Sequence, residues 1–294
     1  MPQPPGDGGP SGVTTGECVA GPSSVAGRRD CLKRTFDSAA VGYQAARPEY
    51  PAELFEDLLS LTGLAPPAPL LEVGCGPGKA TVPLAKRGFQ ITAIELGRQL
   101  AATAQNNLRD YENVEVINAA FEEWEPRDEQ RFDLVYAATS WAWLDPEVKY
   151  AKAAALLRSG RHLAVWNSCH AFPDGFDQFF ADVQPVYDEI GESHPTDWPP
   201  PLPEDVPDDS RAMAASGLFE VAGVRRYLWG MEYTADAYIA LLDTFSSHIS
   251  MDAGKRQYLY DEIRALIDER LSKRVLRHWL AVLTVGQSKS AGHG

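Results

Sequence analysis

The chain has 294 residues, of which 44% are hydrophobic and 23% are charged, and its formal net charge is −14 at neutral pH. This is the composition of a globular protein, large enough for one domain with insertions. The acidic balance disfavours binding to nucleic acid or to anionic membranes, and the sequence has neither a membrane-spanning apolar run nor a signal pattern. The four scattered cysteines include no Cys-x-x-Cys pair, so we expect a reduced, cytoplasmic protein without a zinc site. We expect the protein to be either a monomer or a homodimer.

The first 30 residues are rich in Gly, Pro and Ser and almost lack large apolar side chains. Such a segment cannot bury enough surface to order itself, so we predict a disordered tail over 1–30. A folded domain is expected over 31–290. Its first part, 31–65, contains the segment FDSAAVGYQAARPEYP at 36–51 and a helical pattern over 53–61.

The stretch LLEVGCGPGKAT, at 70–81, changes from an apolar strand to three alternating glycines and then to a helix predicted over 79–86. Glycine permits a positive φ there and lets a ligand approach bare backbone. A dinucleotide fingerprint would need a third glycine where Lys79 stands, so that pattern fails. The carboxylate of Glu72 would repel a pyrophosphate but suits a ligand that carries an ammonium and a sulfonium.

The next apolar strand, 89–94, ends at Glu95, 17 residues beyond Gly78. A carboxylate at the end of this strand can accept hydrogen bonds from both hydroxyls of a ribose. Further along the chain we predict a helix over 98–108, a strand over 114–117, a strand over 132–138, a helix from Pro146 to about Leu157 and a strand over 161–167. This alternation predicts an α/β doubly wound sheet, whose ligands bind at the carboxyl ends of the strands.

The carboxyl-terminal half departs from simple alternation. The stretch 171–210 holds 11 acidic residues and eight prolines but no Lys or Arg, and we interpret 171–215 as an inserted lid with an amphipathic helix over 176–190. A strand over 218–228, helices over 234–247 and 252–271 and a last strand over 275–285 follow. Thus 230–273 forms a helical insertion between the last two strands.

Two motifs carry a family resemblance. The acidic-x-Gly-x-Gly-x-Gly pattern from Glu72 to Gly78 and the Phe-x₃-Ala-x₂-Tyr…Arg-Pro-x-Tyr-Pro segment before it resemble the Rossmann-like, class I S-adenosylmethionine-dependent methyltransferases. The chain is similar to the small-molecule type, such as the trans-aconitate and ubiquinone/menaquinone methyltransferases. The resemblance implies a doubly wound, mostly parallel seven-stranded sheet, with 31–65 as a cap over the cofactor and 171–215 as a lid.

The resemblance also implies a function: transfer of a methyl group from S-adenosylmethionine to a small-molecule acceptor at O, C or N, with S-adenosylhomocysteine as the product. The cofactor-binding residues that it indicates are Glu72, Gly74, Cys75, Gly76, Gly78, Glu95, Leu96, Ala120, Phe121, Ala138, Tyr43 and Arg47. In the family a carboxylate often meets the adenine amino group, and Ala120 stands at the position most like it, so that contact is either missing here or made by Asn118 or by backbone. Trp141 and Trp143 are assigned to the pocket, although we expect one of them to pack beneath the next helix.

The catalytic group is less defined. The family commonly carries a His where Ala142 stands, so His170 and His248 are the candidate bases, and a structural role is open for each. No metal site, nucleic acid partner or membrane partner is expected. Two alternatives are open: a protein of this fold that binds the cofactor without turnover, and a nicotinamide-dependent oxidoreductase, against which Lys79 argues.

Overall fold

The computed structural model describes residues 46–127, 130–192 and 200–289. The predicted tail over 1–30 and the predicted cofactor residue Tyr43 lie outside these ranges. Among the described residues, no helix is long and apolar enough to cross a membrane.

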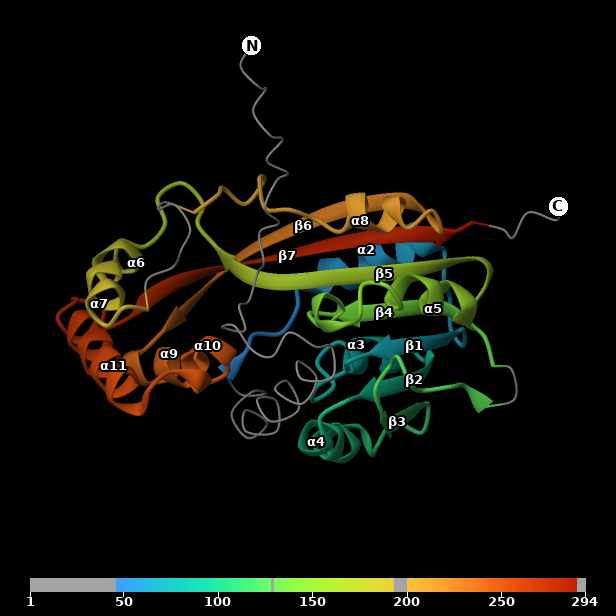
Figure 1. The fold of residues 1–294 in the computed structure, drawn as a ribbon, viewed down its shortest axis with the longest axis horizontal. Coiled ribbons are helices and arrows are strands. Elements are labelled where there is room, and N and C mark those ends of the chain that lie inside the picture. The colour runs from blue at the N-terminus through green and yellow to red at the C-terminus, as the bar shows by residue number, and fades with distance from the viewer. Residues whose placement is uncertain (1–45, 128–129, 193–199, 290–294) are drawn as a thin grey trace, which may run out of the picture.

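One seven-stranded sheet, in the order β3-β2-β1-β4-β5-β7-β6, organises the described chain (Figure 1). Every pairing from β3 to β5 is parallel, and β7 is antiparallel to both of its neighbours. The predicted mostly parallel, doubly wound fold is confirmed. The strand bounds are β1 (Pro69–Val73), β2 (Gln90–Glu95), β3 (Val114–Asn118), β4 (Phe132–Ala138), β5 (Leu157–Ala171), β6 (Phe219–Tyr233) and β7 (Val275–Ser288).

Helices cover both faces of this sheet, as parallel strands require. One face packs against apolar residues of α2 (Ala52–Thr62), α3 (Thr81–Ala85) and α4 (Arg98–Leu108). The opposite face packs against α5 (Lys149–Leu156) and α8 (Ser210–Ala215). The carboxyl ends of β1, β2, β3 and β4 therefore form one open edge between two helical layers, where ligands bind in such sheets.

A second lobe lies at the carboxyl ends of β5 and β6 and the amino end of β7 (Figure 1). These strands extend beyond the predicted bounds because they pair with one another in two long antiparallel ladders. The lobe has its own apolar core, built from α6 (Phe179–Asp182), α7 (Gln184–Glu189), α9 (Ala235–Leu242) and α11 (Ala253–Asp268), with α10 (Ser246–Ser250) beside them. The sequence-based helix over 176–190 is thus two short helices.

The predicted lid over 171–215 does not form one unit. Its first part joins the second lobe, but α8 packs on the main sheet, where Met213 is fully buried against β7 and Phe219. A Cβ on Gly286 of β7 would lie 2.3 Å from the Met213 sulfur, so the glycine makes room for this helix. Among the described residues of 171–215, none lines the cavities described below.

Helix caps agree with the sequence. The Thr234 side chain accepts a hydrogen bond from the Ala237 N–H, and the Asp252 carboxylate accepts from the N–H groups of Gly254 and Lys255. These side chains satisfy donors that a helix amino terminus leaves unpaired. The helix predicted over 234–247 nevertheless ends at Leu242, and a separate short helix follows.

Candidate functional site

Glycines turn the chain sharply after β1. Gly74 has φ +71°, and a Cβ on it would lie 2.5 Å from the Cβ of Ser140, at the exit of β4. Gly76 has φ +54°, and a Cβ on it would meet no atom within 4 Å. Gly74 therefore lets two strand ends pack closely, whereas Gly76 leaves open space over bare backbone, as close approach of a ligand requires.

Glu95, at the end of β2, holds its carboxylate rigidly beside this turn. Its side chain is 5% exposed. One carboxylate oxygen, Oε2, accepts a hydrogen bond of 2.8 Å from the Gly76 N–H, and Oε1 accepts one of 2.8 Å from the Gly97 N–H. A carboxylate oxygen can accept more than one hydrogen bond, and these two N–H groups fix both oxygens of Glu95 at the rim of the first cavity.

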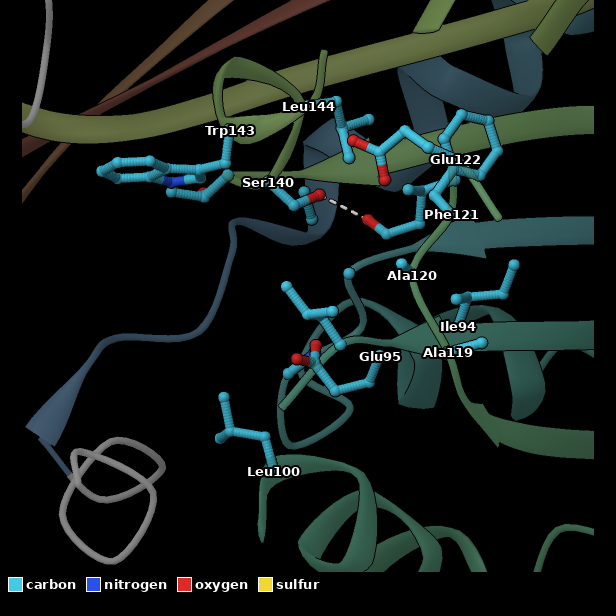
Figure 2. A pocket seen from close by; sticks show the side chains of 16 residues that line it. Ile94, Glu95, Leu100, Ala119, Ala120, Phe121, Glu122, Ser140, Trp143 and Leu144 are labelled. Atoms are coloured by element: carbon cyan, nitrogen blue, oxygen red, sulfur yellow. Dashed lines mark hydrogen bonds between the residues drawn. The ribbon is translucent and has the colours of Figure 1, made fainter. Parts of the chain in front are cut away.

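A first cavity, about 790 Å³ with its open mouth, collects residues from four strand ends (Figure 2). Ile94 and Glu95 come from β2, Phe121 follows β3, and Ser140 and Trp143 follow β4. Gly74, Gly76, Leu96, Ala120 and Ala138, all predicted cofactor residues, also line it.

Glu122 lies on the other side of this cavity from Glu95 (Figure 2). Its Oε1 accepts a hydrogen bond of 3.1 Å from the Asp145 N–H. A carboxylate at this end of the site can accept a hydrogen bond from an exocyclic amino group. The sequence interpretation found Ala120 at the position of the family's carboxylate and left the contact missing or made by Asn118 or backbone, so it did not consider Glu122, two residues further on.

A second cavity of about 490 Å³ lies on the other side of the glycine turn and shares Gly74, Gly76, Ala138 and Thr139 with the first. The remaining lining residues come from the cap, the turn and the long strands: Arg47, Pro48, Tyr50, Cys75, Pro77, Lys79, Ala80, Ser168 and Trp279. Among these described residues there is no His, Asp or Glu. The described lining therefore offers neither an imidazole nor a carboxylate as a general base.

Thr139 lies between the two cavities with φ +63°, a conformation that β-branched residues rarely adopt. Two contacts hold it there. Its N–H donates to the Trp166 carbonyl at 2.7 Å, and its hydroxyl is 2.9 Å from the Tyr50 hydroxyl. Such conformations cost about 1–3 kcal/mol and concentrate at functional sites, and this one fixes the wall common to both cavities.

Glu72 is fully buried and lines neither cavity. Its Oε2 accepts hydrogen bonds from the Thr81 hydroxyl at 2.6 Å and from the Tyr136 hydroxyl at 2.8 Å. Glu72 and Tyr136 are register partners on β1 and β4, so their side chains share the sheet face that α3 covers. Glu72 thus ties α3 to the sheet, and the expectation that it faces a ligand ammonium is not met. Burial raises the pKa of its carboxyl to about 7.

Cys75 lines the second cavity but is 5% exposed. Burial, together with the nearby carboxylates of Glu72 and Glu95, holds the pKa of its thiol well above the ordinary value. The thiol is therefore neutral and a poor nucleophile at neutral pH.

Neither predicted base lines a cavity. His248 lies in the second lobe, where its Nε2 is 3.0 Å from the Tyr187 hydroxyl and its Nδ1 is 3.2 Å from the Ser247 hydroxyl. His170 packs between the rings of Phe172 and Phe180. The structure gives both residues packing roles and does not support the assignment of a catalytic base to either.

Of the remaining predicted residues, some reach a cavity and others do not. Arg47 lines the second cavity and Trp143 the first, but Trp141 is fully buried between the rings of Phe121 and Tyr150. Gly78 lines neither cavity, and a Cβ there would lie 3.1 Å from Leu108 of α4. Among the described residues, no three His, Cys, Asp or Glu side chains gather as a metal site would need.

Sequence reasoning also missed residues of the second cavity. Tyr50 belongs to the Arg-Pro-x-Tyr-Pro motif, and that motif was the available signal for it. Ser168 and Trp279 lie on β5 and β7, and only the antiparallel pairing of these strands brings them to the site.

Comparison with known proteins agrees with this geometry. Residues 70–160, which contain the glycine turn, Glu95 and Phe121, match the family model for a methyltransferase domain. The chain is similar to an uncharacterized methyltransferase of Mycobacterium tuberculosis, with 32% identity over 142 residues that make up 48% of this chain and 55% of that protein. It is also similar to a trans-aconitate 2-methyltransferase of Paracidovorax citrulli, with 32% identity over 112 residues, 37% of this chain and 42% of that protein. The chain spans about half the length of these curated relatives.

Solved structures share the fold. A candidate type II methyltransferase from Anaeromyxobacter dehalogenans superposes with a TM-score of 0.59 and 21% identity, covering 82% of this chain and 97% of that one. The [4+2]-cyclase SpnF superposes with a TM-score of 0.51 and 14% identity, covering 90% of this chain and 97% of that one. At these identities the likeness concerns the fold alone.

The sheet order matches the Rossmann-like fold of a solved methyltransferase structure. Residues 70–160 lie within this fold and match the family model for a methyltransferase domain.

Proposed function

We propose that this protein transfers a methyl group from S-adenosylmethionine to a small-molecule acceptor. The main support for the proposal is the position of the Glu95 carboxylate. It lines the first cavity beside the backbone of Gly74 and Gly76, and the N–H groups of Gly76 and Gly97 fix its orientation. This arrangement suits a ribose, because a rigid carboxylate offers two acceptors to two neighbouring hydroxyls.

The residues of the first cavity fit the rest of the cofactor. Apolar side chains such as Ile94 and Phe121 form walls for a flat adenine, and the Glu122 carboxylate is an acceptor for its amino group. Gly76 lines both cavities, and a Cβ there would meet no atom within 4 Å, so a ligand in the first cavity can lie next to the second. When bound, S-adenosylmethionine supplies a methyl group already activated on a sulfonium.

The second cavity is the proposed site of the acceptor. Because the described residues that line it include no His, Asp or Glu, the chain contributes orientation and exclusion of water rather than proton removal. The acceptor must therefore arrive as a nucleophile, such as a carboxylate, a thiolate or a neutral amine. Its lone pair forms the new bond to carbon, and the electron pair of the broken carbon–sulfur bond stays on sulfur.

A small acceptor agrees with the size and charge of the protein. The second cavity is a confined space between the cap segment, the glycine turn and the long strands, which suits a metabolite better than a macromolecular segment. The net charge of −14 opposes nucleic acid binding. The similarity to a trans-aconitate 2-methyltransferase also supports a small acceptor.

The test is production of S-adenosylhomocysteine, measured by chromatography, with S-adenosylmethionine and a panel of small carboxylates, thiols and amines. Ribosomal RNA serves as the macromolecular comparison. We expect product above the acceptor-free blank with at least one small acceptor, loss of it in Glu95→Ala, and retention in Glu115→Gln, whose side chain is exposed on β3. Tight cofactor binding without product from any acceptor would indicate a binding protein instead.

A further inference from the structure

A buried arginine, Arg277, lies on β7 behind the wall of the second cavity. It is 5% exposed. Its guanidinium carbon lies 4.5 Å from the centroid of the Trp279 ring, and Trp279 lines the cavity. Residues two apart on a strand point to the same face, so Arg277 continues the surface that Trp279 begins.

No carboxylate in the described chain neutralises this cation. The groups that act on it most strongly are the hydroxyls of Tyr238 and Tyr233 and the guanidinium of Arg47. Its Nε is buried without a hydrogen-bond partner among the described residues. Burial lowers the pKa of Arg277, yet a guanidinium stays protonated at neutral pH. A buried charge without a counterion is costly, and a fold retains one where a ligand supplies the counterion.

Arg47 adds a second positive charge at the same place. Its guanidinium carbon lies 4.3 Å from the centroid of the Phe245 ring, and that of Arg277 lies 5.4 Å from the same centroid. The Nε of Arg47 donates to the Thr244 hydroxyl at 3.0 Å, which fixes the side chain where it lines the second cavity. An anion that binds beside Phe245 would therefore lie close to both guanidinium groups.

We propose that Arg277, with Arg47 beside it, binds a carboxylate group of the methyl acceptor. The identification of the bound carboxylate as part of a methyl acceptor rests on the proposed function, whereas the anion-binding site itself rests on the buried guanidinium of Arg277. A guanidinium presents a planar fork of donors that matches a carboxylate, and the rings of Trp279 and Phe245 offer flat apolar surface to the carbon body of the ligand. Acceptors that carry a carboxylate are thus selected over neutral analogues.

The experiment titrates the full chain, saturated with S-adenosylhomocysteine, by calorimetry. The probes are acetate, succinate and benzoate, each compared with its amide, and inorganic phosphate. We expect at least one carboxylate to bind at least tenfold more tightly than its amide, Arg277→Gln to lose at least tenfold of that affinity, and Arg277→Lys to recover part of it. Equal affinity of the carboxylates and their amides, binding of phosphate alone, or undiminished carboxylate binding by Arg277→Gln would each overturn the proposal.

Two controls keep the result interpretable. The affinity of Arg277→Gln for S-adenosylhomocysteine is expected to stay within about twofold of the wild type, which shows that the fold and the first cavity are intact. Should that variant fail to fold, the comparison of carboxylates with amides on the wild type and on Arg277→Lys still decides. If S-adenosylhomocysteine does not bind to the wild type, the cofactor assignment fails, and carboxylate binding lost in Arg277→Gln would still establish the anion site.

Discussion

The Gly76 N–H donates a 2.8 Å hydrogen bond to the Glu95 carboxylate, joining the turn after β1 to the end of β2. The contact spans 19 residues of sequence and connects two adjacent parallel strands. It orients the backbone over which the first cavity opens and aims the carboxylate into that cavity. Turn and carboxylate therefore act as one unit, and a change in either is expected to appear in cofactor binding.

Replacing Glu95 by Gln tests the carboxylate at nearly constant shape. We expect a loss of about 1.5–3 kcal/mol in binding of S-adenosylmethionine, because hydrogen bonds to a charged group are lost and the amide nitrogen must face the N–H of either Gly76 or Gly97. That loss is roughly 10- to 100-fold in Kd. Calorimetry measures it, with Glu115→Gln as the control. An unchanged Kd for Glu95→Gln would remove Glu95 from the site.

Substitutions of Gly74 and Gly76, the two glycines of the turn, are expected to have different effects on stability and on cofactor binding. Gly76→Ala has open space for its methyl group, so it costs only about 1 kcal/mol of stability for the positive φ but places carbon where the ligand must lie. Gly74→Ala places a methyl group 2.5 Å from the Ser140 Cβ and must move the β4 exit, so we expect a larger loss of Tm. Thermal unfolding and cofactor titration of both variants separate the effects. Equal loss of stability in the two would contradict this assignment.

Trp141 and Trp143, which follow β4, allow a second comparison of two matched substitutions. Trp141 is fully buried, and Trp141→Ala is expected to cost about 3–5 kcal/mol of unfolding free energy, as core truncations of this size do. Trp143 lines the first cavity, so Trp143→Ala should weaken cofactor binding with a smaller loss of stability. Denaturant unfolding and calorimetry give the two quantities. The reverse pattern would mean that Trp141 is the residue at the ligand.

The buried carboxyl of Glu72 predicts a pH dependence of stability. Its pKa is raised to about 7 in the folded state from an ordinary value of 4.5, so the folded state holds the proton more tightly than the unfolded state. Stability from this group is therefore full below the unfolded pKa and declines as pH rises from about 4.5 to about 7, by on the order of 3 kcal/mol at most. Glu72→Gln mimics the protonated form and accepts the same bonds from Thr81 and Tyr136, so its Tm should fall less over this range.

The matched control for this pH series is Glu115→Gln, which alters an exposed carboxylate. It should follow the wild-type profile from about pH 4.5 to about pH 8. Parallel profiles for the wild type and Glu72→Gln would show that the Glu72 carboxyl does not titrate between the two states in this way.

Much of the half of the sheet that carries the first cavity could be predicted from sequence because its signals are local. An apolar run that breaks into Gly74 and Gly76 predicts a strand and a turn, and Glu95 follows the next apolar run at the same sheet edge. Parallel strands place their carboxyl ends together, so separate motifs converge on one site without knowledge of distant contacts.

The remainder depends on pairings that no local pattern shows. Trp279 and Arg277 come to the site only because β7 runs antiparallel to β5 and extends past the main sheet. Trp141 and Trp143 lie at the two ends of a short 3₁₀ turn, and the rotation of the backbone along this turn decides which of the two rings is buried. The histidines were plausible bases by residue type alone, and tertiary packing assigns His248 to Tyr187 instead.

The most direct test of the central claim is calorimetric titration of the wild-type chain with S-adenosylhomocysteine, with NADH as the comparison. The account predicts binding of S-adenosylhomocysteine at micromolar Kd with one site per chain, and no heat with NADH. Absence of S-adenosylhomocysteine binding by a protein that circular dichroism shows to be folded, or preferential binding of NADH, would contradict the assignment of the first cavity to the adenosyl cofactor.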